Sequence, residues 1–573
     1  MKGLKRLLLA SAISASCIQG AWAIGAYPRP IVMRQPDGTT LLVRIQGDEN
    51  YHFVTSSDGF FLQRDKKGYF CYVDYDLKTG KRTLTRQRAH NIDERTDAEK
   101  KVISRLTASQ TANVDYFKRN RIERKAPAKT LDKKVIAPRR VLGKNVKVKE
   151  SQYLVILVNF SDSTMRYKNS DFDRWLNEPG YSVNGGTGSV KDYYRDNSMG
   201  QYVPNFQVVG PYTLSKPTAY YGGNTGDSGT DTNPRDMVRE ALELARQNNP
   251  DLNFAQFDND GDGEMDNCYI IYAGYSEAST ANTDDIWPHS WNFTTADANG
   301  DVPVKPEYDG IKVNNYSCSA ELVGMPGAPA KPSMDGIGTF THEFGHVLGL
   351  KDMYDTDNTD NGVGIDPGDY SLYASGSYNN ESRTPPYLMA FERMQMGWMN
   401  EGDDIVEIKN PEDVSLESLS ENKARFINAQ PNREPGTGME WFILENRQQT
   451  GWDKYIPAHG LLITHYDYTK EKQEQWWDIN GPNNVASHRC LYIVPADGID
   501  DSNTRSGDTF PGSSANTSFT DNTTPNSRNW NNEPLGVPVT NINEGDGIVR
   551  FEVSGGTSRW NTFKTLEPVD VRD

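Results

Sequence analysis

Cysteine is scarce in this chain of 573 residues: there are five, and one of them, Cys17, lies close to the amino terminus. The other four are far apart in the sequence, so they form neither a zinc ribbon nor a CxxC redox motif. Four cysteines in so long a chain also exclude a small fold held together by disulfides. The sequence is compatible with one disulfide but does not indicate which two cysteines would form it. The four are Cys71, Cys268, Cys318 and Cys490.

Basic residues and long apolar runs are also in short supply. The chain has 61 Lys and Arg against 78 Asp and Glu, a net charge of −17. This balance argues against a nucleic-acid partner for the whole molecule, because phosphate binding requires a basic surface. No stretch beyond the first 23 residues approaches the ~20 uninterrupted apolar residues of a transmembrane helix. Aromatic residues make up 10% of the chain, which is typical of a globular protein, and the length predicts about two to four domains.

Residues 1–23 have the features of a signal peptide. Three basic residues precede a short apolar run at 7–18, and alanines flank Trp22 where signal peptidase would cut. We therefore expect cleavage after Ala23 and export, to the medium or to the cell envelope. A lipoprotein signal around Cys17 is the alternative, but a serine stands three residues before it, where a lipobox has an aliphatic residue.

Residues 24–99 are expected to form a β-rich prosegment. Two β-rich runs, 41–45 and 69–73, are punctuated by Asp-Gly turns. Residues 100–149 then change character: 16 Lys and Arg stand against three acidic residues, a local charge of +13. Such a stretch is typical of a solvated, protease-sensitive connector. It is either an exposed linker or the cleavage region between an inhibitory prosegment and an active domain.

Residues 150–400 mix strand and helix patterns, and we assign the catalytic domain to them. The run 153–160 is apolar enough for a central strand that is covered on both faces. Residues 236–247 and 338–348 show helical spacing. From 401 to 573 the pattern is β-rich, with apolar runs separated by Asn, Gly, Pro and Asp. The predicted fold class is α+β, with a mixed catalytic domain between a β-rich prosegment and a β-rich C-terminal region.

The segment from His342 to Asp352 carries the chemistry. His342 and His346 lie four residues apart, so on a helix they face the same side and can bind one Zn²⁺. Glu343 is beside the metal without coordinating it, where it can take a proton from water and return one to a leaving amine. Gly349 lets the chain turn back after the helix, which brings Asp352 into reach as a third ligand. Two imidazoles and one carboxylate leave a position open for water, as in catalytic sites.

The sequence leaves two alternatives to this interpretation, one for the motif as a whole and one for its third ligand. Two core histidines beside an incidental glutamate would give the same motif, but the chain has only eight histidines, which makes a chance match rare. Asp355 is a rival carboxylate for the third ligand. It lies three residues beyond Asp352, and the spacing after Gly349 favours Asp352.

The run HEFGHVLGLKDMYD, residues 342–355, resembles the immune inhibitor A-type secreted zinc metalloproteases. These proteins are similar to metzincins but have Asp where most metzincins have a third His. Further segments extend the resemblance over about residues 150–555: GSVKDYYRDNSMG (188–200), DIWPHSW (285–291), ENRQ (445–448) and GDTFPG (507–512). The resemblance implies a metzincin-like protease domain, built on a twisted sheet with the zinc-site helix, and a bacterial source. The N-terminal segment resembles the prosegments of related bacterial proteins more loosely.

One position departs from the metzincin pattern. Metzincins place a methionine in a turn below the zinc, and this chain has Tyr373 in the corresponding stretch, 369–378. Tyrosine is larger and its hydroxyl needs a partner, so we expect altered packing without loss of zinc. Tyr378 is a candidate donor to the tetrahedral oxyanion, as tyrosines are in some relatives. The alternative for Tyr378 is a packed aromatic residue.

A second metal signal lies in an acidic loop. Carboxylates at alternate positions, with Gly263 sixth, match the opening of an EF-hand-type calcium loop. The twelfth position is Tyr269 and not Glu, so we predict a Ca²⁺ loop outside an EF-hand, with a solvated acidic turn as the alternative. The candidate ligands are Asp258, Asp260, Asp262, Glu264 and Asp266. A later acidic stretch, Asp355, Asp357 and Asp360, stays undecided.

The remaining chemistry-bearing side chains show no metal-ligand spacing. His289, flanked by tryptophans, is expected to be buried and hydrogen-bonded, and His459, His465 and His488 to serve packing in the C-terminal region. Cys71 offers a thiolate that would block the open zinc position, but its aromatic neighbours are typical of a strand interior. A structural role for Cys71 is therefore favoured.

Together these patterns predict a secreted zinc endopeptidase that is made as a zymogen and cleaves proteins or peptides. Its cofactors would be one catalytic Zn²⁺ and structural Ca²⁺, with Glu343 as general base and then acid. A trypsin-like protease that cuts between about Lys118 and Lys149 would activate it. The alternative is a secreted Ca²⁺-dependent adhesion or carbohydrate-binding protein whose protease domain has lost activity, and the intact HExxH motif argues against it.

Overall fold

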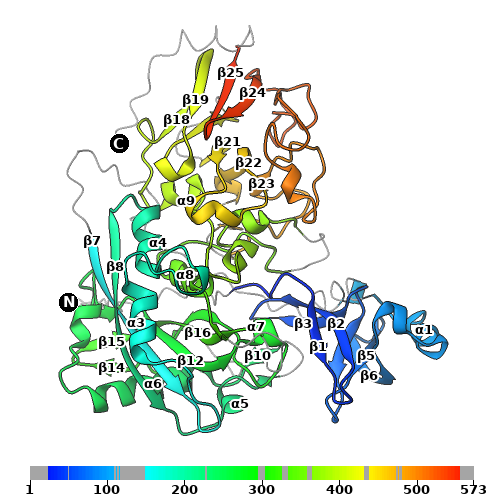
Figure 1. Ribbon diagram of the computed structural model, residues 1–573, viewed down its shortest axis with the longest axis vertical. Coiled ribbons are helices and arrows are strands. Elements are labelled where there is room, and N and C mark those ends of the chain that lie inside the picture. Colours follow the sequence, from blue (N-terminus) through cyan, green and yellow to red (C-terminus); the bar gives the residue numbers. More distant parts are fainter. Residues whose placement is uncertain are drawn as a thin grey trace, which may run out of the picture.

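A computed structural model describes residues 24–554 with gaps at residues 50, 109–110, 113–114, 116–148, 226–228, 295–302, 325–332, 358–363, 431–437, 473–474 and 477–479. The predicted signal peptide and most of the predicted cleavage region lie outside the described residues. In Figure 1 the N-terminal segment, in blue, lies beside the green central region, and the yellow and red C-terminal region lies above it. The chain is a mixed α/β protein with several sheets and few helices.

The N-terminal segment forms a six-stranded antiparallel sheet in which each strand pairs with the next. Buried residues alternate with more exposed ones along β2, the period of a strand with one face on a core. The predicted runs 41–45 and 69–73 lie in β2 and β5, apart from Tyr69. A short helix, α1 (Asp97–Ile103), follows the sheet. The strands are β1 (Ile31–Arg34), β2 (Thr40–Gly47), β3 (His52–Ser56), β4 (Phe61–Arg64), β5 (Phe70–Asp76) and β6 (Lys81–Arg88).

The central region is built on a six-stranded sheet with the order β13-β16-β12-β7-β8, and β17 pairs with β16. Four neighbouring strands, β16, β12, β7 and β8, are parallel, whereas β13 and β17 run antiparallel to β16. The run predicted at 153–160 is the end of β7 and is buried on both faces. The strands are β7 (Lys149–Asn159), β8 (Tyr202–Thr213), β12 (Cys268–Tyr275), β13 (His289–Asn292), β16 (Asn315–Val323) and β17 (Ser333–Met334).

Helices cover both faces of this sheet. On β7, Tyr153, Val155 and Leu157 face one hydrophobic core, which includes residues of α3, α4 and α8. The residues between them face a second core, which is closed by the apolar side of α6. The helices are α3 (Asn169–Asn177), α4 (Val190–Asn197), α6 (Pro234–Asn248) and α8 (Ile337–Val347), with one-turn helices α5 (Thr218–Tyr221) and α7 (Glu277–Thr280). Two small sheets are β9 (Asn224–Thr225) with β10 (Thr230–Asp231), and β11 (Glu264–Met265), β15 (Ile311–Val313) and β14 (Glu307–Tyr308).

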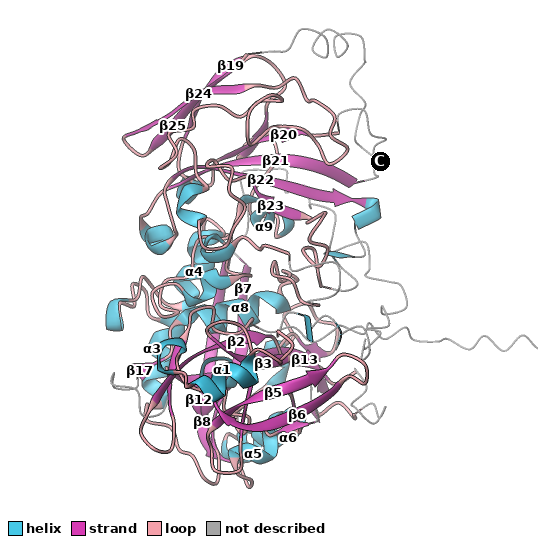
Figure 2. Cartoon of the chain, turned by 90° about the vertical axis from the view of Figure 1, so that its right-hand side faces the viewer, coloured by secondary structure: helices cyan, strands magenta, loops and turns pink. Residues whose placement is uncertain are grey.

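The C-terminal region adds a five-stranded and a three-stranded sheet, whose strands lie in the upper part of Figure 2. The core around α8 continues into the five-stranded sheet, because Ile443, Leu462 and Tyr466 belong to the same cluster as Phe340 and Phe344. The first sheet consists of β18 (Ile405–Glu407), β20 (Ala424–Asn428), β21 (Gly438–Arg447), β22 (Gly460–Thr469) and β23 (Leu491–Ile493). The second consists of β19 (Glu412–Leu416), β25 (Ile548–Val553) and β24 (Val539–Gly545), and α9 (Ala390–Gln395) precedes both.

All four cysteines beyond residue 23 are buried and none forms a disulfide. Cys71 lies in β5 with a side chain in the sheet interior, and burial raises the pKa of its thiol. Among the described residues, every helix is too short or too polar to cross a membrane.

Candidate metal centre

The motif helix α8 is buried along almost its whole length, from Ile337 to His346. It ends at Val347, two residues before Gly349, the residue that the sequence predicted as the exit from the helix. Gly349 has φ +99°, a left-handed conformation that favours glycine. The N–H of Leu350 then bonds back to the carbonyl of Gly345 at 3.2 Å. This turn reverses the chain and brings the following segment beneath the helix.

His342, His346 and Asp352 are brought together as one group, with ligand atoms within 4.8 Å of one another. Each imidazole has its Nδ1 against a carbonyl oxygen, of Leu372 at 2.9 Å and of Leu350 at 2.8 Å. A carbonyl only accepts, so each Nδ1 carries the hydrogen and each Nε2 presents a lone pair. Burial also lowers the pKa of His346, which favours the neutral ring that binds metals.

Three acceptors therefore point at one another in a buried space. The two Nε2 atoms are 3.1 Å apart, and Asp352 Oδ1 lies 3.1 Å from Nε2 of His342 and 3.4 Å from that of His346. Asp352 Oδ1 has no hydrogen-bond donor among the described residues. Lone pairs held this close repel unless a cation lies between them. Two imidazoles and a carboxylate are ligands that suit Zn²⁺, so the residues present fit that ion.

Tyr373 lies beneath both candidate imidazoles. Its ring centroid is 5.1 Å from that of His342 and 5.3 Å from that of His346. Gly345 makes room for it, because a Cβ at that position would lie 1.6 Å from Tyr373 Oη. The Tyr373 hydroxyl is buried and has no hydrogen-bond partner among the described residues. The aromatic ring thus occupies the place that the sequence comparison with metzincins assigns to methionine.

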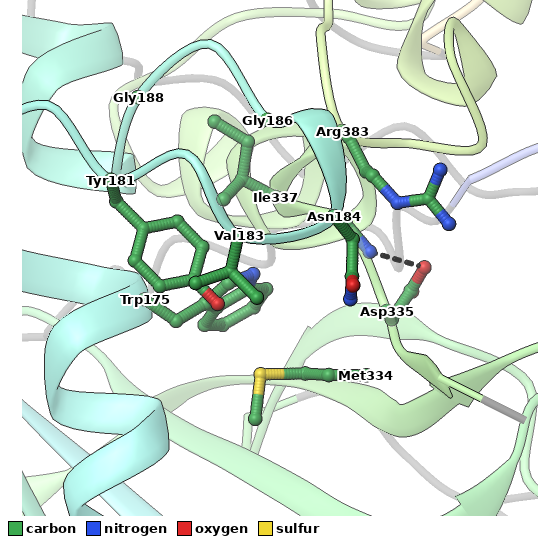
Figure 3. Close-up of a pocket in the computed structure, with 11 residues that line it drawn as sticks. Trp175, Tyr181, Val183, Asn184, Gly186, Gly188, Met334, Asp335, Ile337 and Arg383 are labelled. Carbon is green, nitrogen blue, oxygen red and sulfur yellow. Dashed lines mark hydrogen bonds between the residues drawn. The ribbon is translucent and has the colours of Figure 1, made fainter.

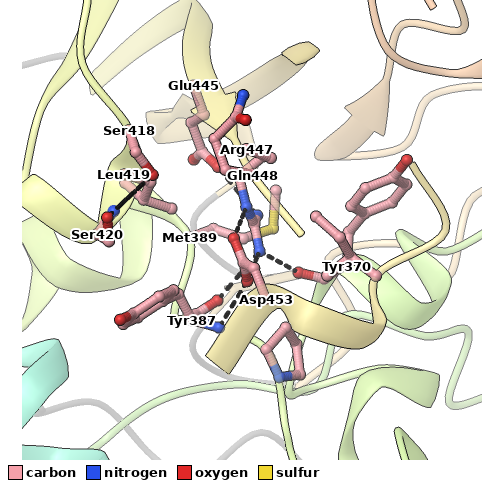
Figure 4. Close-up of polar contacts among 12 residues, drawn as sticks. Tyr370, Tyr387, Met389, Ser418, Leu419, Ser420, Glu445, Arg447, Gln448 and Asp453 are labelled. Atoms are coloured by element: carbon pink, nitrogen blue, oxygen red, sulfur yellow. Dashed lines mark hydrogen bonds and ion pairs between the residues drawn. The ribbon is translucent and has the colours of Figure 1, made fainter. Parts of the chain in front are cut away.

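The turn that carries Leu372 is anchored by the C-terminal region (Figure 4). Arg447, on β21, is fully buried, and its Nε and Nη2 each donate to the carboxylate of Asp453 at 2.7 Å. Its Nη2 also donates to the carbonyl of Tyr370 at 3.3 Å. Since His342 bonds to Leu372, two residues along the same turn, this network helps to orient the imidazole.

Glu343 points to the same buried space. Its Oε1 accepts a hydrogen bond of 2.7 Å from the backbone nitrogen of Ile24, and its Oε2 has no partner among the described residues. Burial raises the pKa of the Glu343 carboxyl well above its usual range, and the nearby carboxylate of Asp352 adds to the shift. A carboxyl with a raised pKa is suited to exchanging protons near neutral pH.

The residues from Ile24 to Tyr27 lie against this site. Tyr378 Oη donates to the carbonyl of Gly25 at 2.7 Å, and Trp287 Nε1 donates to the carbonyl of Ile24 at 3.0 Å. Ile24 is 1% exposed. Tyr378, which the sequence marked as a candidate oxyanion donor, therefore donates to a peptide carbonyl here. Sequence reasoning missed Ile24 and Trp287, because their partners are hundreds of residues away.

The comparisons with known proteins concern the part of the chain that contains this group. Residues 142–399 match the family described as "Immune inhibitor A peptidase M6, catalytic domain". This part of the chain is therefore similar to the catalytic domain of the immune inhibitor A-type peptidases. The sequence resemblance is confirmed, and the matched residues include α8 and Asp352.

Three curated relatives show the same likeness. Over 330 residues the chain is 28% identical to "Pre-pro-metalloprotease PrtV" from two strains of Vibrio cholerae serotype O1, covering 51% of this chain and 34% of the relative. Over 287 residues it is 28% identical to "Immune inhibitor A" from Bacillus thuringiensis subsp. alesti, covering 42% of this chain and 38% of the relative. The chain thus spans little more than a third of the length of these relatives.

The peptidase domain also contains the predicted calcium loop, and the structure brings together three of its five candidate ligands, Asp258, Asp260 and Asp262. Asp258 already accepts the backbone N–H groups of Gly261, Asp262 and Gly263. Of the other two, Glu264 pairs with Lys305 at 2.5 Å, and Asp266 accepts hydrogen bonds from Asn259. Neither belongs to the group of three.

A small pocket opens at the N-terminal end of α8 (Figure 3). Trp175, Tyr181 and Met334 form its apolar wall, and Asp335 and Arg383 its polar side. Burial raises the pKa of Asp335 to about 7, although the N–H of Gly336 and the hydroxyl of Thr339 bond to the carboxylate. The pocket contains none of the candidate metal ligands.

The other histidines stay outside the metal group. His289 is buried between the carbonyl of Trp287 and the hydroxyl of Tyr316, and burial lowers its pKa to about 4. This matches the expected buried, hydrogen-bonded ring. In the C-terminal region His459, His465 and His488 each bond to a carboxylate, of Glu544, Glu440 and Asp467 respectively.

Proposed function

We propose that the chain is a secreted, zinc-dependent metalloendopeptidase that is held latent by its own N-terminal segment. The observation that supports this most strongly is the convergence of three buried acceptors, from His342, His346 and Asp352, beside the carboxyl of Glu343. The peptidase family match, which covers these residues, points to the same chemistry. Proteins or peptides would be the substrates.

His342, His346 and Asp352 would hold the zinc ion. When bound there, Zn²⁺ supplies a Lewis acid that polarises the scissile carbonyl and lowers the pKa of a water molecule. Glu343 would remove a proton from the attacking water and deliver it to the leaving amine. Tyr378 Oη would donate to the oxyanion of the tetrahedral intermediate, as it donates to the Gly25 carbonyl in the latent form.

Latency would follow from the position of the N-terminal segment. The backbone nitrogen of Ile24 donates to Oε1 of Glu343, the proposed general base. The carbonyl of Gly25 accepts from the hydroxyl of Tyr378, the candidate oxyanion donor. A substrate would have to displace both contacts. If signal peptidase cuts after Ala23, Ile24 begins the exported chain, and its nitrogen is then a charged α-amino group beside the Glu343 carboxyl.

The test of the proposed catalytic site is Glu343→Ala in protein trimmed with trypsin. We expect casein and peptide hydrolysis to fall at least about a thousandfold, because Glu343 is the proposed general base and acid, while about one zinc per chain remains bound. Glu307→Ala, at an exposed position of β14, is the matched control and should keep full activity. Loss of zinc together with activity would make Glu343 structural.

Removal and return of zinc in the trimmed wild-type protein decides between the protease and the alternative of an inactive Ca²⁺-dependent binding protein. Hydrolysis by the trimmed wild type that disappears with a zinc chelator and returns with zinc supports the protease. Wild-type protein that binds zinc and hydrolyses nothing would support the alternative.

The calcium loop is proposed as a structural site. Its test is thermal stability: calcium should raise the melting temperature of wild type, and Asp260→Ala should remove this effect.

A further inference from the structure

The third candidate metal ligand is held by a residue from the C-terminal region. Asp352 Oδ2 accepts a hydrogen bond of 2.6 Å from Asn480 Nδ2, and the backbone N–H of Asp352 donates to Asn480 Oδ1 at 3.1 Å. The two residues are 128 positions apart in the sequence. Asp352 is 1% exposed and Asn480 is 5% exposed, so both hydrogen bonds are shielded from water.

The two oxygens of the Asp352 carboxylate have different surroundings. Oδ2 is taken by the amide of Asn480, whereas Oδ1 faces Nε2 of His342 and Nε2 of His346. Rotation of the carboxylate would break the bond to Asn480. The amide is therefore positioned to keep one oxygen directed at the metal position, as partners of ligating carboxylates do in metal sites.

Asparagine is the side chain that this position requires. One atom must accept from a backbone N–H and the next must donate to a carboxylate, and a primary amide does both. Asn480 also has φ +48°, a conformation that Asn and Gly adopt more readily than other residues. Aspartate would fit the shape but would place a second carboxylate against Asp352 Oδ2.

Neighbouring residues of the same loop fasten it to the segment after Asp352. Asn483 Nδ2 donates to the carbonyl of Met353 at 2.8 Å, and Asn484 Oδ1 accepts the N–H of Thr356 at 2.9 Å. Asn483 Oδ1 in turn accepts the N–H of Leu491, the first residue of β23, at 3.0 Å. The loop thus joins the candidate metal centre to the five-stranded sheet of the C-terminal region.

We propose that Asn480 is a positioning residue that completes the metal site from the C-terminal region, by holding Asp352 in the orientation that binds zinc. This inference rests on the proposed function, since it concerns the affinity of the same metal site. It implies that the peptidase domain alone lacks part of its metal centre. The C-terminal region is then a component of the active site as well as a neighbour of it.

The experiment measures zinc affinity by competition with a chelator, in the full chain from residue 24 onward. Asn480→Gly removes both side-chain hydrogen bonds but keeps the left-handed backbone and the carbonyl that accepts from Thr356. We expect its Kd for zinc to rise about 10–100-fold, the usual effect of removing a partner of a ligand. Asn480→Asp, which retains the shape and the acceptor, should also bind zinc more weakly.

Asn484→Ala is the matched control. It removes hydrogen bonds from the same loop to Thr356 but does not contact Asp352. We expect its zinc affinity to stay within about twofold of wild type. The thermal shift on adding zinc should shrink in Asn480→Gly and persist in Asn484→Ala, whereas the melting temperatures of the two zinc-free variants should be similar.

The outcomes separate the two proposals. Wild-type protein that binds no zinc contradicts the proposed function itself. Wild-type protein that binds zinc, with an Asn480→Gly variant that binds it equally well, overturns the positioning role and leaves the proposed function standing. Equal losses of affinity in Asn480→Gly and Asn484→Ala would also overturn it, because the effect would then belong to the loop as a whole.

Discussion

Two kinds of side chain surround the candidate metal position: the three proposed ligands and the residues that pack against them. The packing is unusual at Tyr373, whose ring lies under both imidazoles while its hydroxyl is buried without a partner among the described residues. A buried hydroxyl that makes no hydrogen bond costs about 1–3 kcal/mol of stability. The ring therefore stabilises the site by packing, and its oxygen contributes nothing that the structure shows.

Tyr373→Phe tests this division. Removing the hydroxyl should leave the free energy of unfolding unchanged or raise it by about 1 kcal/mol, because the ring is kept and an unsatisfied polar group is lost. Tyr193→Phe is the control: Tyr193 is equally buried, but its hydroxyl donates to the carbonyl of Pro386 at 2.8 Å, so its loss should destabilise by about 1 kcal/mol. Denaturant unfolding measures both. Equal destabilisation of the two variants would show that Tyr373 Oη has a partner.

The choice between Asp352 and Asp355 as third ligand is a second question at this scale. Asp352→Ala should weaken zinc binding at least about 100-fold, because two imidazoles rarely retain zinc alone. In Asp355→Ala zinc binding should persist, since the Asp355 carboxylate accepts the N–H groups of Asp357 and Gly364 instead of facing the imidazoles. Zinc content of the purified variants gives the answer. Loss of zinc from Asp355→Ala alone would reverse the assignment.

At the scale of elements, the N-terminal sheet meets the peptidase domain through β3 and α7. His52 Nε2 lies 2.9 Å from Glu277 Oε1, and the ring stacks on Trp287 with centroids 4.2 Å apart. Burial lowers the pKa of His52, but the attraction and hydrogen bond of Glu277 outweigh it, so the net pKa is raised above its ordinary value. Asp48, whose carbonyl contacts Nδ1, adds to the rise. Docking of the sheet is therefore linked to protonation of His52.

This linkage predicts that the proposed latency weakens at alkaline pH. A raised pKa in the docked state means that the stabilisation is complete below pH ~6.5 and is lost as the pH rises through the raised value. The activity of the uncut chain, divided by that of the trimmed enzyme at the same pH, should increase from pH 6 to pH 9. His52→Ala should raise this ratio at pH 6 and flatten its pH dependence. His459→Ala, at an exposed pair with Glu544, should change neither; a wild-type ratio that is constant with pH would exclude the linkage.

For the whole molecule, the basic stretch at 100–149 lies between the docked N-terminal sheet and the first central strand. β7 begins at Lys149, so a cut before that residue leaves the central sheet intact. The N-terminal segment would then remain only by non-covalent contacts, including those at Ile24 and His52. Cleavage would convert a tethered inhibitor into a dissociable one.

Limited digestion with trypsin tests this arrangement. Glu343→Ala protein, which cannot process itself, should give a stable fragment that starts between residues 119 and 150. The same treatment of wild type should raise activity against casein, because the cut allows the N-terminal segment to dissociate from Glu343 and Tyr378. An uncut chain that is already as active as the trimmed form would show that the N-terminal segment is a folding aid or an accessory module.

Local patterns in the sequence were sufficient to predict several helices and strands and to predict which candidate ligands come together. The predicted helix at 338–348 is α8, Ile337–Val347, and the predicted helix at 236–247 is α6, Pro234–Asn248. The spacing of His342 and His346 made their approach a consequence of helical geometry. The approach of Asp352 to the two histidines was predicted from the turn at Gly349. The candidate ligands lie within ten residues of one another in the sequence. Over such a short distance the local backbone geometry largely determines which side chains meet.

The sequence by itself determined the HExxH helix, the turn at Gly349 and the strands with regular burial, because periodicity and turn residues act locally. The tertiary structure alone decided which distant residues complete the site. Ile24 meets Glu343 across 319 positions, and Asn480 meets Asp352 across 128. Such contacts depend on how sheets stack and where loops end, and a single sequence carries no local signal for them. The spacing of the candidate ligands is therefore set locally in this protein. The orientation of Asp352 and the contact of Ile24 with Glu343 depend on the packing of the whole chain.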